Sequence, residues 1–208
     1  MQALTPVEIL QKVHVRYEGN TDYPTTGEED HTVRVAYLDD SVSALEREAM
    51  NGVKFDFLRA EESLTAGGTG SDDLPIDFLS FLTDYIKAGS TEYVRTDKAT
   101  GNFYEQSESA PYVFWKEGTK LRSLPALSGT VTFPYQRTFT RFPLGTESTT
   151  ADGEGSYYVE SVIAMLYLSD GDLNQYNVHA NNAKDIFDSM KGDAITSAPN
   201  QSQFGIGM

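Results

Sequence analysis

The sequence predicts an α+β protein: an antiparallel helical bundle of two N-terminal and two C-terminal helices, interrupted by a small antiparallel β-rich subdomain, with an extended C-terminal arm. Two observations predict the helical bundle and the β-rich subdomain. Apolar residues recur at spacings of three and four near both ends of the chain, and short apolar or aromatic segments separated by turn residues fill the middle. At 39% hydrophobic residues, the chain is rich enough in apolar side chains to form a packed core.

The same patterns divide the 208 residues into four parts. We expect an N-terminal helix pair over residues 1–60, a β-rich insert over 61–145, a C-terminal helix pair over 146–191 and an arm over 192–208. The arm is polar, contains Gly, Ser and Pro, and is not expected to fold alone.

Two helices are expected in the first part. Thr5 to Glu8 form a capping-box pattern with proline at the first helical position, and the helix that follows ends near Gly19. Asp30 is expected to cap a second helix from about His31 to Met50. Its apolar residues keep spacings of three and four: Val35, Leu38, Val42, Leu45 and Ala49.

The middle of the chain predicts a small sheet. Residues 66–73, "AGGTGSDD", are typical of a loop. Short segments separated by turn residues are expected to form four or five antiparallel strands. These segments are 92–95, 102–105, 112–115, 120–124 and 130–135.

Helices are expected again after residue 155. Ser156 is a candidate cap for the first, and Asp172 begins another capping-box pattern. The helix after Asp172 has an apolar stripe at spacings of three and four, formed by Leu173, Tyr176, Ala180, Ala183, Phe187 and Met190.

The formal net charge of -15 is unevenly distributed. Residues 1–110 carry 9 Lys/Arg and 21 Asp/Glu, and residues 143–208 carry 2 and 9, whereas residues 111–142 carry 5 and 1. An acidic chain is a poor ligand for nucleic-acid phosphates, which need several basic contacts on one surface. The basic segment is expected either to face an acidic surface on another subunit or to protect an exposed strand edge.

No catalytic, cofactor or metal site is predicted. The chain has no cysteine, and its three histidines, His14, His31 and His179, fall on three different predicted helices. The glycines at 67–70 lack the Lys-Ser/Thr of a phosphate-binding loop, and residues 170–174 are better explained by a helix cap than by a calcium loop. No apolar run is long enough for a membrane span, and no signal peptide is visible. We therefore expect a non-enzyme.

Three segments together resemble the head-to-tail adaptor, or head-completion, proteins of tailed bacteriophages. They are "DDLPIDFLSF" at 72–81, "FPYQRTFTRFPL" at 133–144, and the sequence from 156 to 191 with its Asp-Gly-Asp turn. The resemblance covers roughly residues 5–191, through patterns rather than invariant signatures, and it supplies no catalytic residues.

The resemblance implies a virion protein made in the host cytoplasm and located at the head-tail junction. It implies a homo-oligomeric ring, commonly of twelve subunits, that binds the portal protein and a downstream neck or tail protein. DNA is expected to pass through the channel without specific binding, because an acidic lumen offers phosphates no counter-charge.

Aromatic and arginine residues are enriched at protein interfaces, so residues 132–144 are a candidate subunit or partner contact. The predicted interface residues are Tyr135, Arg137, Phe139, Arg141 and Phe142, with Phe204 and Ile206 on the arm. Alternation places Phe133 and Tyr135 on one strand face, and Pro134 and Pro143 argue against a long central strand.

Two alternatives remain open. One is another neck or tail-completion ring, such as a stopper protein. The other is a soluble carbohydrate-binding or hydrolytic module in which Tyr112, Phe114 and Trp115 stack on sugar rings, although "YVFW" is better explained as a buried strand.

Overall fold

The computed structural model describes residues 2–21, 28–106 and 111–191. Within them, the chain forms five α-helices and an eight-stranded mixed sheet that is nearly barrel-shaped. The helices are α1 (Pro6–Glu18), α2 (Glu29–Met50), α3 (Lys98–Glu105), α4 (Gly155–Ser169) and α5 (Leu173–Met190). The strands are β1 (Arg59–Gly67), β2 (Ser71–Asp73), β3 (Phe78–Phe81), β4 (Tyr85–Ala88), β5 (Thr91–Arg95), β6 (Val113–Glu117), β7 (Lys120–Leu124) and β8 (Ser128–Arg137).

The predicted fold class is wrong, because the β part is not a small antiparallel subdomain within a helical bundle. The strand order is β1-β8-β4-β5-β6-β7-β2, with β3 also paired to β8. Strands β5 and β6 are parallel, so the sheet is mixed. A parallel pair needs a long connection between its strands, and α3 lies in that connection. The predicted arm, residues 192–208, lies outside the described residues.

The two end strands of the sheet, β1 and β2, follow one another in the chain and approach each other in space. The backbone N–H of Gly67, at the end of β1, donates to Asp72 Oδ1 in β2 over 2.8 Å. This contact brings the two edges of the sheet together, which gives the sheet its nearly closed form.

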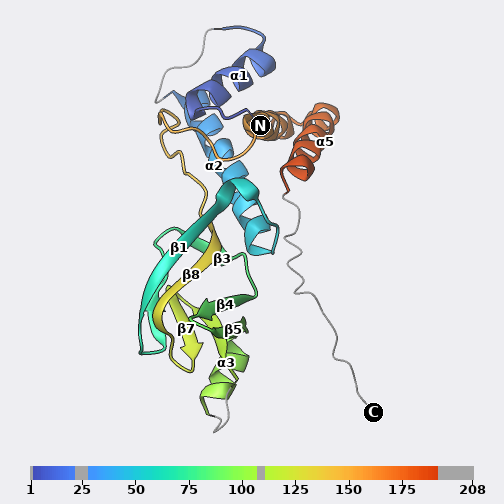
Figure 1. The fold of residues 1–208 in the computed structure, drawn as a ribbon. Coiled ribbons are helices and arrows are strands. Elements are labelled where there is room, and N and C mark those ends of the chain that lie inside the picture. The colour runs from blue at the N-terminus through green and yellow to red at the C-terminus, as the bar shows by residue number, and fades with distance from the viewer. Residues whose placement is uncertain (1, 22–27, 107–110, 192–208) are drawn as a thin grey trace.

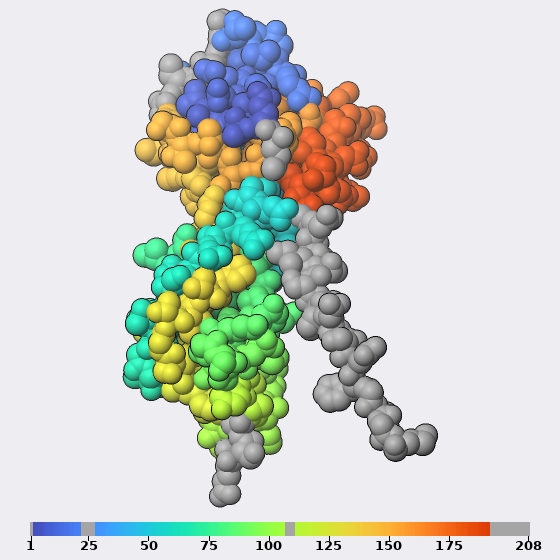
Figure 2. Space-filling model, viewed as in Figure 1, coloured from blue at the N-terminus to red at the C-terminus, as the bar shows by residue number. Residues whose placement is uncertain are grey.

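The molecule has two lobes stacked along its long axis (Figures 1 and 2). The helical lobe contains α1, α2, α4 and α5, and the β lobe contains the sheet and α3. Each lobe has its own cluster of buried apolar residues. Helix α4 is the centre of the helical lobe and packs against α1, α2 and α5.

The helix caps confirm one sequence prediction in full and one in part. At α1 the Thr5 hydroxyl accepts from the Glu8 N–H, and the Glu8 carboxylate accepts from the Thr5 N–H over 2.8 Å, which is the predicted capping box. At α5 the Asp172 carboxylate accepts from the N–H groups of Asn174 and Gln175, whereas the Asp172 N–H donates to the Tyr167 carbonyl over 2.9 Å, so the cap is present but the reciprocal half of the predicted capping box is not.

Two other caps were placed slightly too late. The N-cap position is Glu28 rather than Asp30 in α2 and Glu154 rather than Ser156 in α4, and neither glutamate side chain makes a capping hydrogen bond. Asp30 lies in the first turn of α2, where the helix dipole also favours a carboxylate. An acidic residue is therefore expected both at a cap and in the first turn, so the sequence alone does not fix the first residue of the helix.

The prediction of four or five strands was also wrong. Residues 102–105, expected as a strand, belong to α3, whose cap is the Asp97 carboxylate that accepts from the Thr100 N–H over 2.8 Å. The expected loop at 66–73 contains the end of β1 and all of β2. Strands β1, β2, β3 and β4 were missed, because β1 carries only one buried residue and the others are three or four residues long.

Strand β8 is a long central strand, contrary to the expectation drawn from Pro134. It pairs with β1 on one side and with β4 and then β3 on the other. Pro134 lies between the β4-paired residues Val131 and Thr132 and the β3-paired residues that begin at Tyr135. Its missing N–H therefore interrupts no ladder on that side, and its carbonyl accepts from the Leu82 N–H over 3.2 Å.

Candidate functional site

Residues 136–144 carry the chain from the β lobe into the helical lobe (Figure 1). Gln136 is fully buried where they begin. Its Nε2 donates to the carbonyl of Val53 over 3.0 Å and to Ser80 Oγ over 3.2 Å, and its Oε1 accepts from the Phe55 N–H over 2.9 Å. One amide thus joins β8, β3 and the segment after α2, which fixes the junction between the lobes.

Arg137 ties the end of β8 to the loop before α4. Its guanidinium binds both carboxylate oxygens of Asp152, at 2.5 Å and 3.3 Å. The Asp152 side chain is only 10% exposed and also accepts from the Thr140 N–H over 2.7 Å. The hydrogen bonds that Arg137 donates to Asp152 raise the pKa of Arg137 against the opposing effect of burial. A bidentate, largely buried pair of this kind holds its geometry better than a surface ion pair.

Arg141 ties the same segment to α2. Its guanidinium donates to Asp39 Oδ1 over 2.9 Å and to Ser43 Oγ over 2.8 Å, and it forms an ion pair with Glu46. Both arginines of the segment therefore contact acidic groups of their own chain.

The aromatic residues of the segment are buried. Tyr135 lies in the core of the β lobe on the same face as Phe133, as the alternation predicted, and its hydroxyl donates to Asp77 Oδ1 over 2.9 Å. Burial, with help from Asp77, raises the pKa of Tyr135 to about 12. Phe139 and Phe142 lie in the core of the helical lobe, because the regular strand ends at Arg137.

The predicted interface role of these five residues stays a prediction. Within the single chain the three aromatic residues are buried, Arg137 is partly buried and Arg141 is exposed, so the five do not form one exposed patch. Phe204 and Ile206 lie outside the described residues.

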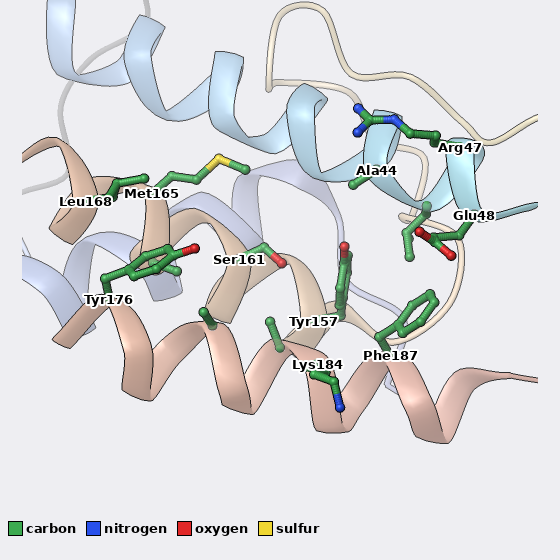
Figure 3. A pocket seen from close by; sticks show the side chains of 14 residues that line it. Ala44, Arg47, Glu48, Tyr157, Ser161, Met165, Leu168, Tyr176, Lys184 and Phe187 are labelled. Carbon is green, nitrogen blue, oxygen red and sulfur yellow. The ribbon is translucent and has the colours of Figure 1, made fainter. Parts of the chain in front are cut away.

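A groove in the helical lobe was not predicted. It lies between α2 and α5, has α4 as its floor, and measures about 460 Å³ (Figure 3). Tyr176 and Phe187 lie towards its two ends along α5 (Figure 3). Ala164 of α4 and Ala180 and Ala183 of α5 are among the small side chains that line it.

The sequence did contain a signal for this groove. Tyr176, Ala180, Ala183 and Phe187 belong to the apolar stripe of the predicted helix after Asp172, yet among these four only Ala183 is buried. An apolar helix face that the rest of the domain covers only in part is typical of a binding surface.

A polar cluster joins three helices of this lobe. Glu160 of α4 is buried and accepts from Arg16 of α1 over 2.6 Å and from His179 Nδ1 and Asn182 of α5, over 2.7 Å and 3.2 Å. Burial raises the pKa of Glu160, but the three hydrogen bonds outweigh it and hold that pKa below its ordinary value. The imidazole of His179 also stacks on the ring of Tyr167. This cluster fixes the position of α5 against α4.

The described residues contain no group of three or more His, Asp or Glu side chains placed to hold a metal ion. Among them, no helix combines the length and the apolar character that a membrane crossing needs. Phe114 and Trp115 are buried, and Tyr112 is half exposed.

The chain matches no protein-family model, and no curated protein is significantly similar to it.

Proposed function

We propose that the protein is a head-to-tail adaptor of a tailed bacteriophage, which forms a ring below the portal, extends the DNA channel and offers a docking surface to the tail. The observation that carries the proposal is the occurrence of the three resembling segments in one chain and in the family's order. The acidic charge of -15 supports a channel that DNA passes without binding.

The positions of these segments agree with a role in the framework of the subunit. "DDLPIDFLSF" includes β3, whose Phe78 and Phe81 lie in the core of the β lobe. Residues 156–191 include α4 and α5, which form a helical hairpin with a turn at Gly171. The resembling residues thus specify the two lobes and their connection, as expected for a protein whose function is structural.

The connection between the lobes suits a protein that must hold two partners in a fixed relative position. Gln136, Arg137 and Arg141 each bind groups from other parts of the chain at the junction. A ring of identical subunits also needs two different complementary faces on each subunit, and two lobes of distinct architecture can supply them.

The alternative of a neck or stopper ring shares this logic, and only the identity of the partner separates the two. The carbohydrate-binding alternative has less support. Phe114 and Trp115 are inaccessible, since α3 covers Trp115 so closely that a Cβ on Gly101 would lie 2.5 Å from the Trp115 ring.

Co-sedimentation tests the proposal. Purified protein is mixed separately with portal particles and with tails encoded by the same genome, and each pellet is quantified. An adaptor binds the portal in the absence of tails. A protein that binds only tails is a tail-completion protein, and one that pellets with neither contradicts the proposal.

A further inference from the structure

The groove between α2 and α5 has a lining suited to a short apolar segment. Small residues, including Ser161, Ala164, Ala180 and Ala183, contribute to its surface, so a branched side chain fits close to the backbone of α4 and α5. Phe187 lies towards one end and Tyr176 towards the other (Figure 3).

The chain leaves the described structure at one end of this groove. Helix α5 ends at Met190, which is buried, and Lys191 follows in an extended conformation. The Lys191 ammonium lies 4.4 Å from the centre of the Phe187 ring and 2.5 Å from Asp188 Oδ1. The last described residue, Lys191, therefore lies beside the Phe187 end of the groove.

The chain beyond this point is long enough to cross the groove. The eleven-residue separation of Tyr176 and Phe187 along α5 corresponds to about 16 Å. An extended chain covers that distance in about five residues. Gly192 can adopt the backbone conformations that reverse a chain after a helix. In an extended crossing after such a reversal, Ile195 would reach the level of Phe187 and Ala183, and Ser197, which shares its face, would reach the level of Ala180.

We infer that the groove binds residues 193–199 of the same chain, with Ile195 on the surface of small side chains. This segment, "DAITSAP", supplies Ala194, Ile195 and Ala198 as its apolar residues. Phe204 and Ile206 lie too far along the chain to occupy the groove in the same extended crossing. They stay available to another partner. The inference does not depend on the adaptor proposal.

Covalent connection favours this occupant over a second copy. A segment held by a short linker has an effective concentration in the millimolar range, whereas a separate molecule must also lose its translational freedom. The same-chain segment therefore fills the groove first in dilute solution.

Disulfide cross-linking tests this directly, because the chain contains no cysteine. The test variant carries Ala180→Cys and Ser197→Cys, because Ser197 shares the groove-facing side of the extended segment with Ile195. The matched control carries Asn181→Cys and Ser197→Cys, since Asn181 is an exposed neighbour of Ala180 on α5 and does not line the groove. Oxidation is followed at low protein concentration on non-reducing gels, and circular dichroism checks that both variants are folded.

We expect the intramolecular disulfide to form at least about tenfold faster in the test variant than in the control, because docking raises the local thiol concentration. Adding Ile195→Asp to the test variant should reduce its rate to that of the control. Equal rates for the two pairs, or a rate unaffected by Ile195→Asp, overturn the inference. Disulfide-linked dimers in place of the monomeric product overturn the assignment to the same chain.

Discussion

Arg137, the last residue of β8, and Asp152, in the loop before α4, form a bidentate pair with N–O distances of 2.5 Å and 3.3 Å. The pair connects the β lobe to the helical lobe. The sequence suggests Arg137 as a contact for a partner protein, but in the single chain its guanidinium binds Asp152 of the same chain.

The first prediction concerns this pair. Asp152→Ala removes the acceptor for Arg137 and for the Thr140 N–H, so the free energy of unfolding should fall by about 2–4 kcal/mol. Urea denaturation measures it. Glu92→Ala is the control, because Glu92 and Lys87 form a 3.9 Å pair with both side chains more than half exposed. That control should cost less than about 0.5 kcal/mol, and similar losses in both variants contradict the structural role of Asp152.

The second prediction concerns Gly101 in α3. A Cβ at this position would lie 2.5 Å from the Trp115 ring, so Gly101→Ala should destabilise the protein by about 1–3 kcal/mol although alanine is normally the better helix residue. Trp115 is the only tryptophan in the chain, so its emission should shift to the red. Gly67→Ala, with no atom closer than 3.7 Å, is the control and should change stability by less than about 0.5 kcal/mol. A stabilised Gly101→Ala would refute the close packing.

The third prediction separates core from surface for Phe139. Its ring packs against Phe55 and Phe57 at 5.8 Å and 6.1 Å between centroids, so Phe139→Ala should cost about 3–5 kcal/mol. Phe103→Ala, at a side chain that is 69% exposed, should cost less than about 0.5 kcal/mol. Thermal and urea unfolding measure both. Equal effects would mean that Phe139 is not a core residue and would restore its interpretation as a surface contact.

The fourth prediction concerns pH. The folded-state pKa of Glu160 is lowered, so its ionised form contributes stability that is present above its unfolded-state pKa, near 4.5, and is lost as pH falls through the folded-state value. At pH 7, Glu160→Gln should therefore cost about 1–3 kcal/mol. The difference between wild type and variant should shrink as pH drops below 4.5. Unfolding free energies measured between pH 7 and pH 3.5 test this, and a constant difference across that range contradicts it.

The sequence predicted the elements whose signals are local. The capping box at Thr5 and the cap at Asp172 are local hydrogen-bonding patterns, and both are present. The strand prediction failed where the signal depends on partners distant in sequence. Strand β1 has the burial pattern of a half-covered edge, with only Ala66 buried, and its order comes from nine paired positions on β8.

In the candidate site too, features with a local sequence signal were predicted and features that depend on distant residues were not. The pattern of residues 132–144 predicted that its arginines meet acidic groups of another subunit, whereas in the single chain Asp152 and Asp39 supply these groups. Such pairs depend on how the lobes meet. The groove was missed for a related reason, because a stripe of apolar residues does not reveal how much of it the remaining helices cover.

Electron microscopy of portal particles, alone and with saturating amounts of this protein, tests the central claim most directly. The adaptor proposal predicts an additional ring, coaxial with the portal and attached to its tail-facing end. Portal particles that remain unchanged, or that carry the protein only as isolated copies off the axis, would contradict it.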